Sequence, residues 1–240
     1  MKNLLAKTLL GLALITPTAL VQADISGNVN LTSDYRFRGI SQSGDDSALQ
    51  GGLDYSHESG FFAGVWGSNV DFYAAGDAYD NDESIELDIY AGYSGEVSDR
   101  ISYDLSLYRY FYPGAITSAD YSELSLGVEV GPARLAYWYA DDYFNSGEDY
   151  RYIEANYSLA LPAELALDIH AGHSFGSYFD DPAAVGLDEY NDYSLTLSRS
   201  WAGLDIALAY MDTDIDAAWR INSGHLANQD AWVLSISKSL

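Results

Sequence analysis

The sequence lacks cysteine altogether and is poor in basic residues. Without cysteine, the chain is excluded from the disulfide-stapled class of small exported domains. Its 11 lysines and arginines stand against 36 acidic residues, for a net charge of −25. That balance argues against binding nucleic acid, which needs basic clusters, and against docking on anionic lipid through a basic face. After the first 23 residues no apolar run reaches about 18 residues, so spanning helices are excluded as well.

The N-terminus has the pattern of a signal peptide. Lys2 and Lys7 precede an apolar stretch over residues 8–20, and Val21-Gln22-Ala23 places small residues before a cleavage point after Ala23. The stretch is too short to span a bilayer as a helix, and a structural N-terminal helix is the alternative. We therefore expect a signal peptide over residues 1–23 and a single domain over residues 24–240.

What the sequence has in abundance is tyrosine, glycine and period-two hydrophobicity. It contains 21 tyrosines and 21 glycines but 5 prolines. In the first run Ile25, Val29 and Leu31 share one parity, and asparagine, threonine and arginine side chains share the other. The apolar positions of all the runs fall within residues 25–37, 49–55, 62–72, 85–93, 101–107, 124–130, 135–139, 153–159, 165–171, 193–197, 204–210 and 232–236.

A spanning strand needs about 9–11 residues, with one face in lipid and the other facing a polar interior. The runs therefore predict an all-β fold, a transmembrane antiparallel up-and-down barrel of about twelve strands. In the third run the apolar face consists of Phe62, Trp66, Val70 and Phe72, opposite Asn69 and Asp71. With strands about 4.8 Å apart and tilted by about 40°, the backbone radius is on the order of 12 Å, which side chains narrow further.

The connections alternate between short and long. Short turns are expected near residues 58–60, 95–99, 131–132, 161–163 and 201–203, and longer links at 39–47, 73–83, 113–120, 141–149, 177–189 and 212–229. Outer-membrane barrels place short turns in the periplasm and long loops outside, so both termini are expected in the periplasm.

Aromatic residues gather where the strands approach the long links. A soluble lipocalin-like barrel or a sandwich also alternates, but neither places so many aromatics at strand ends. We interpret these residues as an interfacial girdle at the lipid headgroups: Phe72-Tyr73, Tyr108 to Tyr112, Tyr137 to Tyr139, Tyr150 and Tyr152.

Charged residues on the inward parity are the candidate lumen and selectivity residues. Arg36 and Arg38 lie at the expected extracellular end of the first strand, and the inward carboxylates outnumber them. An arginine in a confined polar lumen either pairs with carboxylates or forms part of a selectivity constriction. The excess of acid predicts a preference for cations. The candidates are Asp34, Arg36, Arg38, Asp54, Glu86, Asp88, Asp104 and Asp168.

The long links are themselves acidic. Asp212, Asp214 and Asp216 have the spacing that opens a calcium loop, but Ala217 replaces the required glycine and Ser223 the closing glutamate. They are weak metal candidates. Two interpretations stay open: divalent-cation binding that bridges lipopolysaccharide, or a solvated acidic surface.

Patterns for catalysis are weak. His57-Glu58-Ser59 lies in an expected periplasmic turn, the wrong side for a barrel phospholipase. Asp168 and His170 have the spacing of a barrel protease pair but lie close to a periplasmic turn, so we expect a hydrogen bond between them in the wall. His173 and His225 have no metal-ligand partners at convincing spacing, and no phosphate-binding loop is found. We expect neither enzymatic activity nor a cofactor.

A longer stretch carries a family resemblance. Residues 26–29, the run Ser33-Asp34-Tyr35-Arg36-Phe37-Arg38-Gly39-Ile40-Ser41-Gln42-Ser43, residues 48–55 and residues 64–70 resemble the TorF family, formerly grouped as conserved hypothetical proteins of proteobacteria. The resemblance implies an outer-membrane barrel and a porin label, and no catalytic residues. Such barrels usually end in an aromatic residue that the barrel-assembly machinery reads, whereas this chain ends in Leu240, with Lys238 on the outward parity.

Two functional hypotheses follow. The first is a narrow passive channel in the outer membrane of a Gram-negative bacterium, passing ions or small solutes and preferring cations. The second is a closed structural or surface-interaction barrel whose acidic loops bind divalent cations, lipopolysaccharide or a partner. The sequence leaves the oligomeric state open.

Overall fold

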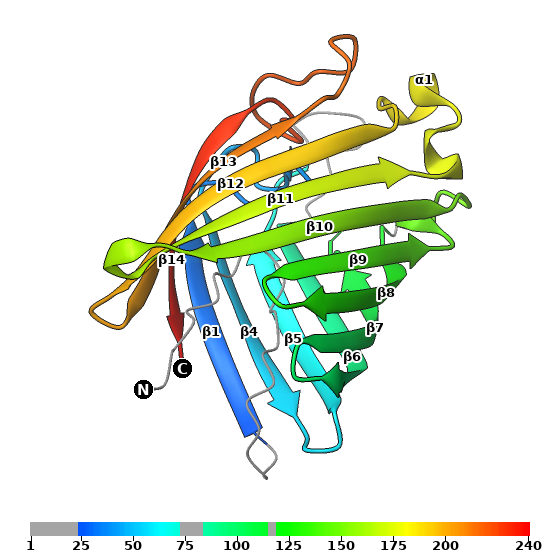
Figure 1. The fold of residues 1–240 in the computed structure, drawn as a ribbon. Coiled ribbons are helices and arrows are strands. Elements are labelled where there is room, and N and C mark those ends of the chain that lie inside the picture. Colours follow the sequence, from blue (N-terminus) through cyan, green and yellow to red (C-terminus); the bar gives the residue numbers. More distant parts are fainter. Residues whose placement is uncertain (1–23, 73–83, 115–118) are drawn as a thin grey trace.

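The fold is a closed antiparallel barrel of twelve strands (Figure 1). The computed structural model describes residues 24–72, 84–114 and 119–240, so the predicted signal peptide lies outside the described residues. The barrel strands are β1 (Asp24–Thr32), β4 (Ala48–Ser56), β5 (Phe61–Asn69), β6 (Ile85–Ser98), β7 (Ile101–Phe111), β8 (Tyr121–Val130), β9 (Ala133–Ala140), β10 (Tyr150–Ala160), β11 (Leu165–Phe175), β12 (Tyr190–Trp201), β13 (Leu204–Thr213) and β14 (Ala231–Ser239). The predicted all-β architecture and the count of twelve are confirmed. In the described residues no helix is long and apolar enough to cross a membrane.

The ring closes between the first and last strands. β1 pairs with β14 through Val29 opposite Lys238 and Leu31 opposite Ile236. Beyond the strand, the Leu240 amide donates to the Gly27 carbonyl at 2.8 Å. β14 thus completes the barrel, so the barrel sheet has no open edge.

Short and long connections lie at opposite ends of the barrel, as predicted. One end, here called the turn end, carries residues 57–60, 99–100, 131–132, 161–164 and 202–203. The other, the loop end, carries residues 33–47, 70–72, 84, 112–114, 119–120, 141–149, 176–189 and 214–230. The loop end lies uppermost in Figure 1, where the short helix α1 (Pro182–Val185) is visible. β6 runs on through a bulge between Glu96 and Ser98, so its turn is Asp99-Arg100 and not the predicted 95–99.

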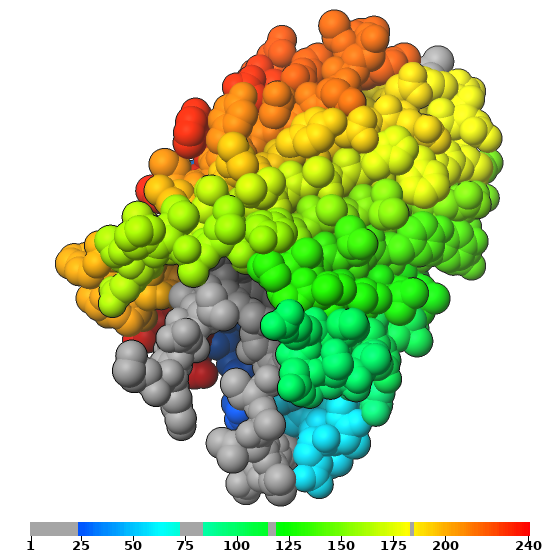
Figure 2. Space-filling model, in the orientation of Figure 1, coloured from blue at the N-terminus to red at the C-terminus, as the bar shows by residue number. Residues whose placement is uncertain are grey.

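The outer surface of the wall is apolar. Large aliphatic side chains are exposed there in cross-strand pairs, such as Leu105 beside Leu126 and Leu31 beside Leu49. The side chains of β7 to β12, green to yellow in Figure 2, form a continuous wall. An apolar belt of this extent is not found on monomeric water-soluble proteins, and it has the chemistry of a lipid-facing surface.

The faces of β5 are the reverse of the predicted ones. Phe62 and Val70 are buried inside the barrel and Trp66 packs against that interior, whereas Phe61 and Val65 are exposed on the outside. The large aromatic side chains of Phe62 and Trp66 suggested a lipid-facing row, but large side chains are also needed to pack the wide interior. On β5, Phe62 and Trp66 fill the interior, whereas Phe61 and smaller residues such as Val65 face outward.

The first strand is also shorter than predicted. β1 ends at Thr32, and residues 33–47 leave the wall. Within that segment β2 (Arg36–Phe37) and β3 (Ile40–Ser41) form a short hairpin. Arg36 and Arg38 therefore do not belong to the wall, and this hairpin positions the candidate site.

Candidate functional site at the loop end of the lumen

The hairpin of residues 36–41 folds into the barrel and is held there. Arg38 and Gly39 at its tip both have positive φ, 50° and 82°, the geometry of a tight type I′ hairpin turn. A Cβ atom on Gly39 would lie 2.4 Å from Thr213 Cγ2 on β13 and 3.1 Å from Asp192 Cβ on β12. Only glycine allows so close an approach between the tip and the wall.

Arg38 anchors the tip to the far side of the barrel. Its guanidinium donates two hydrogen bonds to Glu123 on β8, at 2.8 and 2.9 Å, and both side chains are buried. Aromatic rings surround the guanidinium, with Tyr152 at 4.4 Å and Tyr150 at 4.8 Å from their centroids. Burial alone would lower the pKa of Arg38, but the Glu123 carboxylate raises it well above its usual value. The arginine therefore stays charged and paired.

Arg36 braces the base of the hairpin. It donates to Asp34 at 2.5 Å and to Asp45 at 3.2 Å, and its guanidinium also reaches the carbonyl of Gln229 at 2.6 Å. Asp34 in turn accepts a hydrogen bond from Ser41 at 2.7 Å. Asp34 and Arg36 are thus internal to the folded loop, and both arginines make the carboxylate pairs that the sequence suggested as one alternative.

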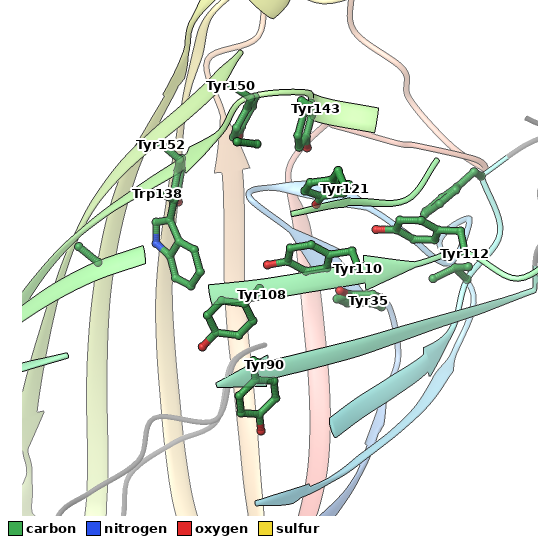
Figure 3. Packing of buried hydrophobic residues seen from close by; sticks show 14 of the residues in the cluster. Tyr35, Tyr90, Tyr108, Tyr110, Tyr112, Tyr121, Trp138, Tyr143, Tyr150 and Tyr152 are labelled. Carbon is green, nitrogen blue, oxygen red and sulfur yellow. The ribbon is translucent and has the colours of Figure 1, made fainter. Parts of the chain in front are cut away.

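Aromatic side chains fill the interior around the hairpin, and the predicted girdle is largely wrong. Tyr137 and Tyr139 face outward, but most of the residues assigned to the girdle point inward (Figure 3). Those that are buried in the lumen are Phe72, Tyr108, Tyr110, Tyr112, Trp138, Tyr150 and Tyr152. Tyr73 lies outside the described residues. The rings stack on one another, as in Tyr110 on Tyr121 at 4.5 Å and Tyr143 on Tyr150 at 4.1 Å.

Tyrosine suits this interior because its hydroxyl can donate to a carboxylate. Tyr110 donates to Glu123 at 3.0 Å, Tyr152 to Asp192 at 3.1 Å, and Tyr90 to Asp54. Each ring thereby fills space and satisfies an acid in a layer where arginines are few.

The loop-end half of the lumen is densely filled. Every strand of the barrel contributes to it at least one inward side chain that is no more than 9% exposed. One such residue from each strand is Thr32, Ala48, Ser68, Glu86, Tyr110, Glu123, Trp138, Tyr150, Ser174, Asp192, Thr213 and Val233. Inward residues of the turn-end half, such as Asp54, Asp104 and Asp168, are more exposed. The interior is thus more tightly packed toward the loops than toward the turns.

The remaining predicted residues lie on the inner wall without converging. Asp54, Asp104 and Asp168 belong to β4, β7 and β11. Asp104 is paired with Arg134 at 2.6 Å, and Asp168 accepts from Ser158. Glu86 and Asp88 lie side by side on β6, buried near Tyr35. Whether these residues act in selectivity stays a prediction.

The expected Asp168–His170 hydrogen bond is not the one that forms. His170 contacts Asp192 on β12 at 2.8 Å and Asn156 on β10 at 2.8 Å. Asn156 lies directly opposite His170, where Cβ atoms are about 4.5–5.5 Å apart. Asp192 lies opposite Gly172, and the absence of a side chain on that glycine leaves room for the carboxylate to reach diagonally to His170. His57 and Ser59 do meet, at 2.8 Å, but in an exposed turn.

The metal candidates at the end of β13 and in the loop that follows it do not form a site. Asp212 pairs with Arg220 at 3.2 Å, Asp214 accepts two hydrogen bonds from Asn191, and Asp216 accepts from the Ala218 amide. Across residues 24–72, 84–114 and 119–240, no three or more His, Asp or Glu side chains are grouped as metal ligands. The acidic residues of the link at 73–83 lie outside the described residues.

Several residues of the site were missed from the sequence. Glu123 fell one position outside the predicted sixth run, which began at Leu124, and Asp192 preceded the run at residues 193–197. Extending the alternation by one pair of residues at the loop end of each run would have found both. The inward tyrosines did carry a signal: Tyr108 and Tyr110 lie on the polar parity of their run, and so do Tyr150 and Tyr152. The aromatic character of these residues suggested an interfacial girdle instead.

Comparison with solved structures places the fold among porins. The KdgM porin matches with a TM-score of 0.54 and 10% identity, covering 90% of this chain and 99% of that one. KdgM porin in complex with disordered oligogalacturonate matches at 0.54 and 8%, covering 90% and 98%. The NanC porin matches at 0.52 and 9%, covering 89% and 98%. These likenesses concern the fold.

Comparison of sequences gives a family but no function. The family model described as "Bacterial protein of unknown function (Gcw_chp)" matches residues 17–240. No curated protein matches the sequence. The TorF name stays a prediction.

Proposed function

This chain belongs to the Gcw_chp family of bacterial proteins of unknown function. We propose that it is an outer-membrane channel for ions or small solutes, with a preference for cations, and that residues 33–47 hold it closed. The observation that carries the proposal is the filled loop-end layer, held by Arg38 and Glu123, inside a barrel with a porin-like fold. A barrel with an apolar outer belt and a polar interior is suited to carrying solutes across the outer membrane of a Gram-negative bacterium. We also propose that residues 1–23 are a signal peptide that is cleaved on export.

The inner wall supports cation preference. Within the described strands its inward charges are mainly carboxylates, and Arg134 is already paired with Asp104. Asp54, Asp168 and Asp205 face inward and contact a phenol or hydroxyl group instead of an arginine. Uncompensated carboxylates along a narrow lumen attract cations and repel anions. Ions and small solutes are the proposed cargo.

Planar-bilayer recording of the purified protein tests the proposal. We expect brief discrete conductance steps, with a reversal potential under a salt gradient that indicates cation preference. Silence across a wide voltage range would favour the alternative, a closed structural barrel whose acidic loops meet divalent cations, lipopolysaccharide or a partner.

The inner carboxylates should set the preference. Changing Asp54, Asp168 and Asp205 together to Asn should move the reversal potential toward zero. The matched control changes the same number of exposed loop acids, Asp180, Asp181 and Asp188, to Asn. If the loop control shifts the reversal potential as much as the Asp54/Asp168/Asp205 variant does, selectivity is set in the loops.

A further inference from the structure

Glu86 and Asp88 are buried carboxylates in the interior that have no basic partner among the described residues. They occupy alternate positions of β6, point inward, and are 2% and 7% exposed. Because residues two apart on a strand share a face, the two carboxylates lie on the same side of β6. Glu86 Oε2 and Asp88 Oδ1 are buried and have no hydrogen-bond donor. Two buried carboxylates this close together can both stay charged only if a positive group lies beside them; without one, at least one of them must be protonated.

No basic side chain supplies that charge. Inside the barrel, Arg38 is committed to Glu123, Arg36 to Asp34 and Asp45, and Arg134 to Asp104. The other basic residues of the strands, Arg109, Arg151, Arg199 and Lys238, lie on the outward parity, and Arg100 lies in a turn-end connection. Arg220 pairs with Asp212 in the last loop. The internal segments 73–83 and 115–118 contain no lysine, arginine or histidine.

The neighbouring donors are equally insufficient. Tyr35 approaches Glu86 Oε1 at 3.4 Å, longer than the roughly 2.5–3.0 Å of a good O–H···O hydrogen bond. Tyr110 donates to Glu123 and Tyr90 to Asp54, so neither hydroxyl serves the pair. The two carboxylates and the Tyr35 hydroxyl offer oxygen atoms, the ligands that hard cations such as Ca²⁺ prefer.

We propose that Glu86 and Asp88 bind one divalent cation, with Ca²⁺ as its chemical type, in the loop-end half of the lumen. The two carboxylates supply the charge, and the Tyr35 hydroxyl and water complete the oxygen shell. The cation balances the pair's charge and ties β6 to the inward-folded loop through Tyr35. This site does not depend on the lumen conducting.

Terbium luminescence tests the site, with Tb³⁺ as the probe for Ca²⁺. The protein is stripped with EDTA in detergent, and emission is recorded on excitation of the surrounding tyrosines. We expect a saturable signal that Ca²⁺ displaces. The double variant Glu86→Gln/Asp88→Asn should lose it. Two controls should keep it: Asp168→Asn/Asp205→Asn at the turn end, and Asp212→Asn/Asp214→Asn/Asp216→Asn in the last loop.

Thermal unfolding separates loss of the site from loss of the fold. Ca²⁺ should raise the midpoint of the wild type by mass action and leave that of the Glu86→Gln/Asp88→Asn variant unchanged. In EDTA the variant should be at least as stable as the wild type, because it removes repulsion between like charges. A wild type with neither a saturable signal nor a Ca²⁺-dependent midpoint would overturn the site and show that the pair shares a proton. If the protein binds the cation but shows no conductance, the proposed channel function is overturned and the cation site is not.

Discussion

At the residue scale the structure depends on one buried charge pair. Arg38 and Glu123 are almost inaccessible, and each satisfies the other through two hydrogen bonds. A buried pair of this kind contributes little net stability compared with apolar packing. Removing one partner is nevertheless costly, because the other charge is left buried without a counter-charge. Its value here is positional, since it fixes the tip of the hairpin against a distant strand.

Changing Arg38→Met should destabilise the barrel by about 3–5 kcal/mol, because the Glu123 carboxylate is left buried and unpaired. Denaturant unfolding in detergent, followed by tryptophan fluorescence, measures the change. Arg199→Met is the control: its contact with Glu164 is 3.7 Å long and exposed, and should contribute about 0–1 kcal/mol. Adding Glu123→Gln to the Arg38 variant should restore part of the loss. Equal unfolding of the two arginine variants would show that the pair does not anchor the hairpin.

Gly39 offers a second residue-scale prediction. Gly39→Ala combines an unfavourable positive φ with a clash against Thr213, whereas Gly44→Ala has the positive φ with contacts no shorter than 3.4 Å. Both variants carry the free-energy cost of alanine at a positive φ. The difference in their stability therefore measures the clash with Thr213. Limited trypsin digestion should cleave after Arg36 or Arg38 in the Gly39 variant and spare the Gly44 variant. Protection of both variants would mean that the tip fits less tightly than described.

At the element scale the alternation of the strands was predictable and the use of the faces was not. Period-two hydrophobicity marked all twelve strands because lipid imposes an apolar face on each of them. The same rule failed on β5, where Phe62 and Trp66 fill the interior. It also missed the hairpin, because Arg36 and Arg38 continue the parity of β1 although the chain has left the wall. An Arg-Gly pair between Phe37 and Ile40 was the available hint of a tight turn.

Two adjacent residues of β1 test the assignment of faces at nearly the same depth. Val29 faces outward and Asn28 inward. Val29→Arg should lower the free energy of unfolding in lipid by about 2–4 kcal/mol, and Asn28→Arg by clearly less. Reversible unfolding from phospholipid vesicles measures both variants. Equal costs, or a larger cost for Asn28→Arg, would reverse the assigned faces.

At the scale of the whole molecule, the lumen of the barrel is filled with side chains in its loop-end half. Its porin-like wall was predictable from the strand pattern, the connections and the charge. The closure was not, because it depends on contacts between residues far apart in the chain, such as Tyr190 with the Arg38 carbonyl at 3.0 Å. Whether the closure is a resting state or permanent separates a channel from a structural barrel.

A removable crosslink tests that closure most directly. A Cβ atom on Gly39 would lie 3.8 Å from Thr213 Cβ, within the usual disulfide range of about 3.5–4.5 Å. Because the sequence has no cysteine, Gly39→Cys/Thr213→Cys introduces the only thiols, and the wild type controls for the reductant itself. In planar bilayers the oxidised variant should be silent, and discrete conductance steps should appear when it is reduced. Equal conductance of the oxidised and reduced protein, with the disulfide verified by mass spectrometry, would contradict closure by residues 33–47.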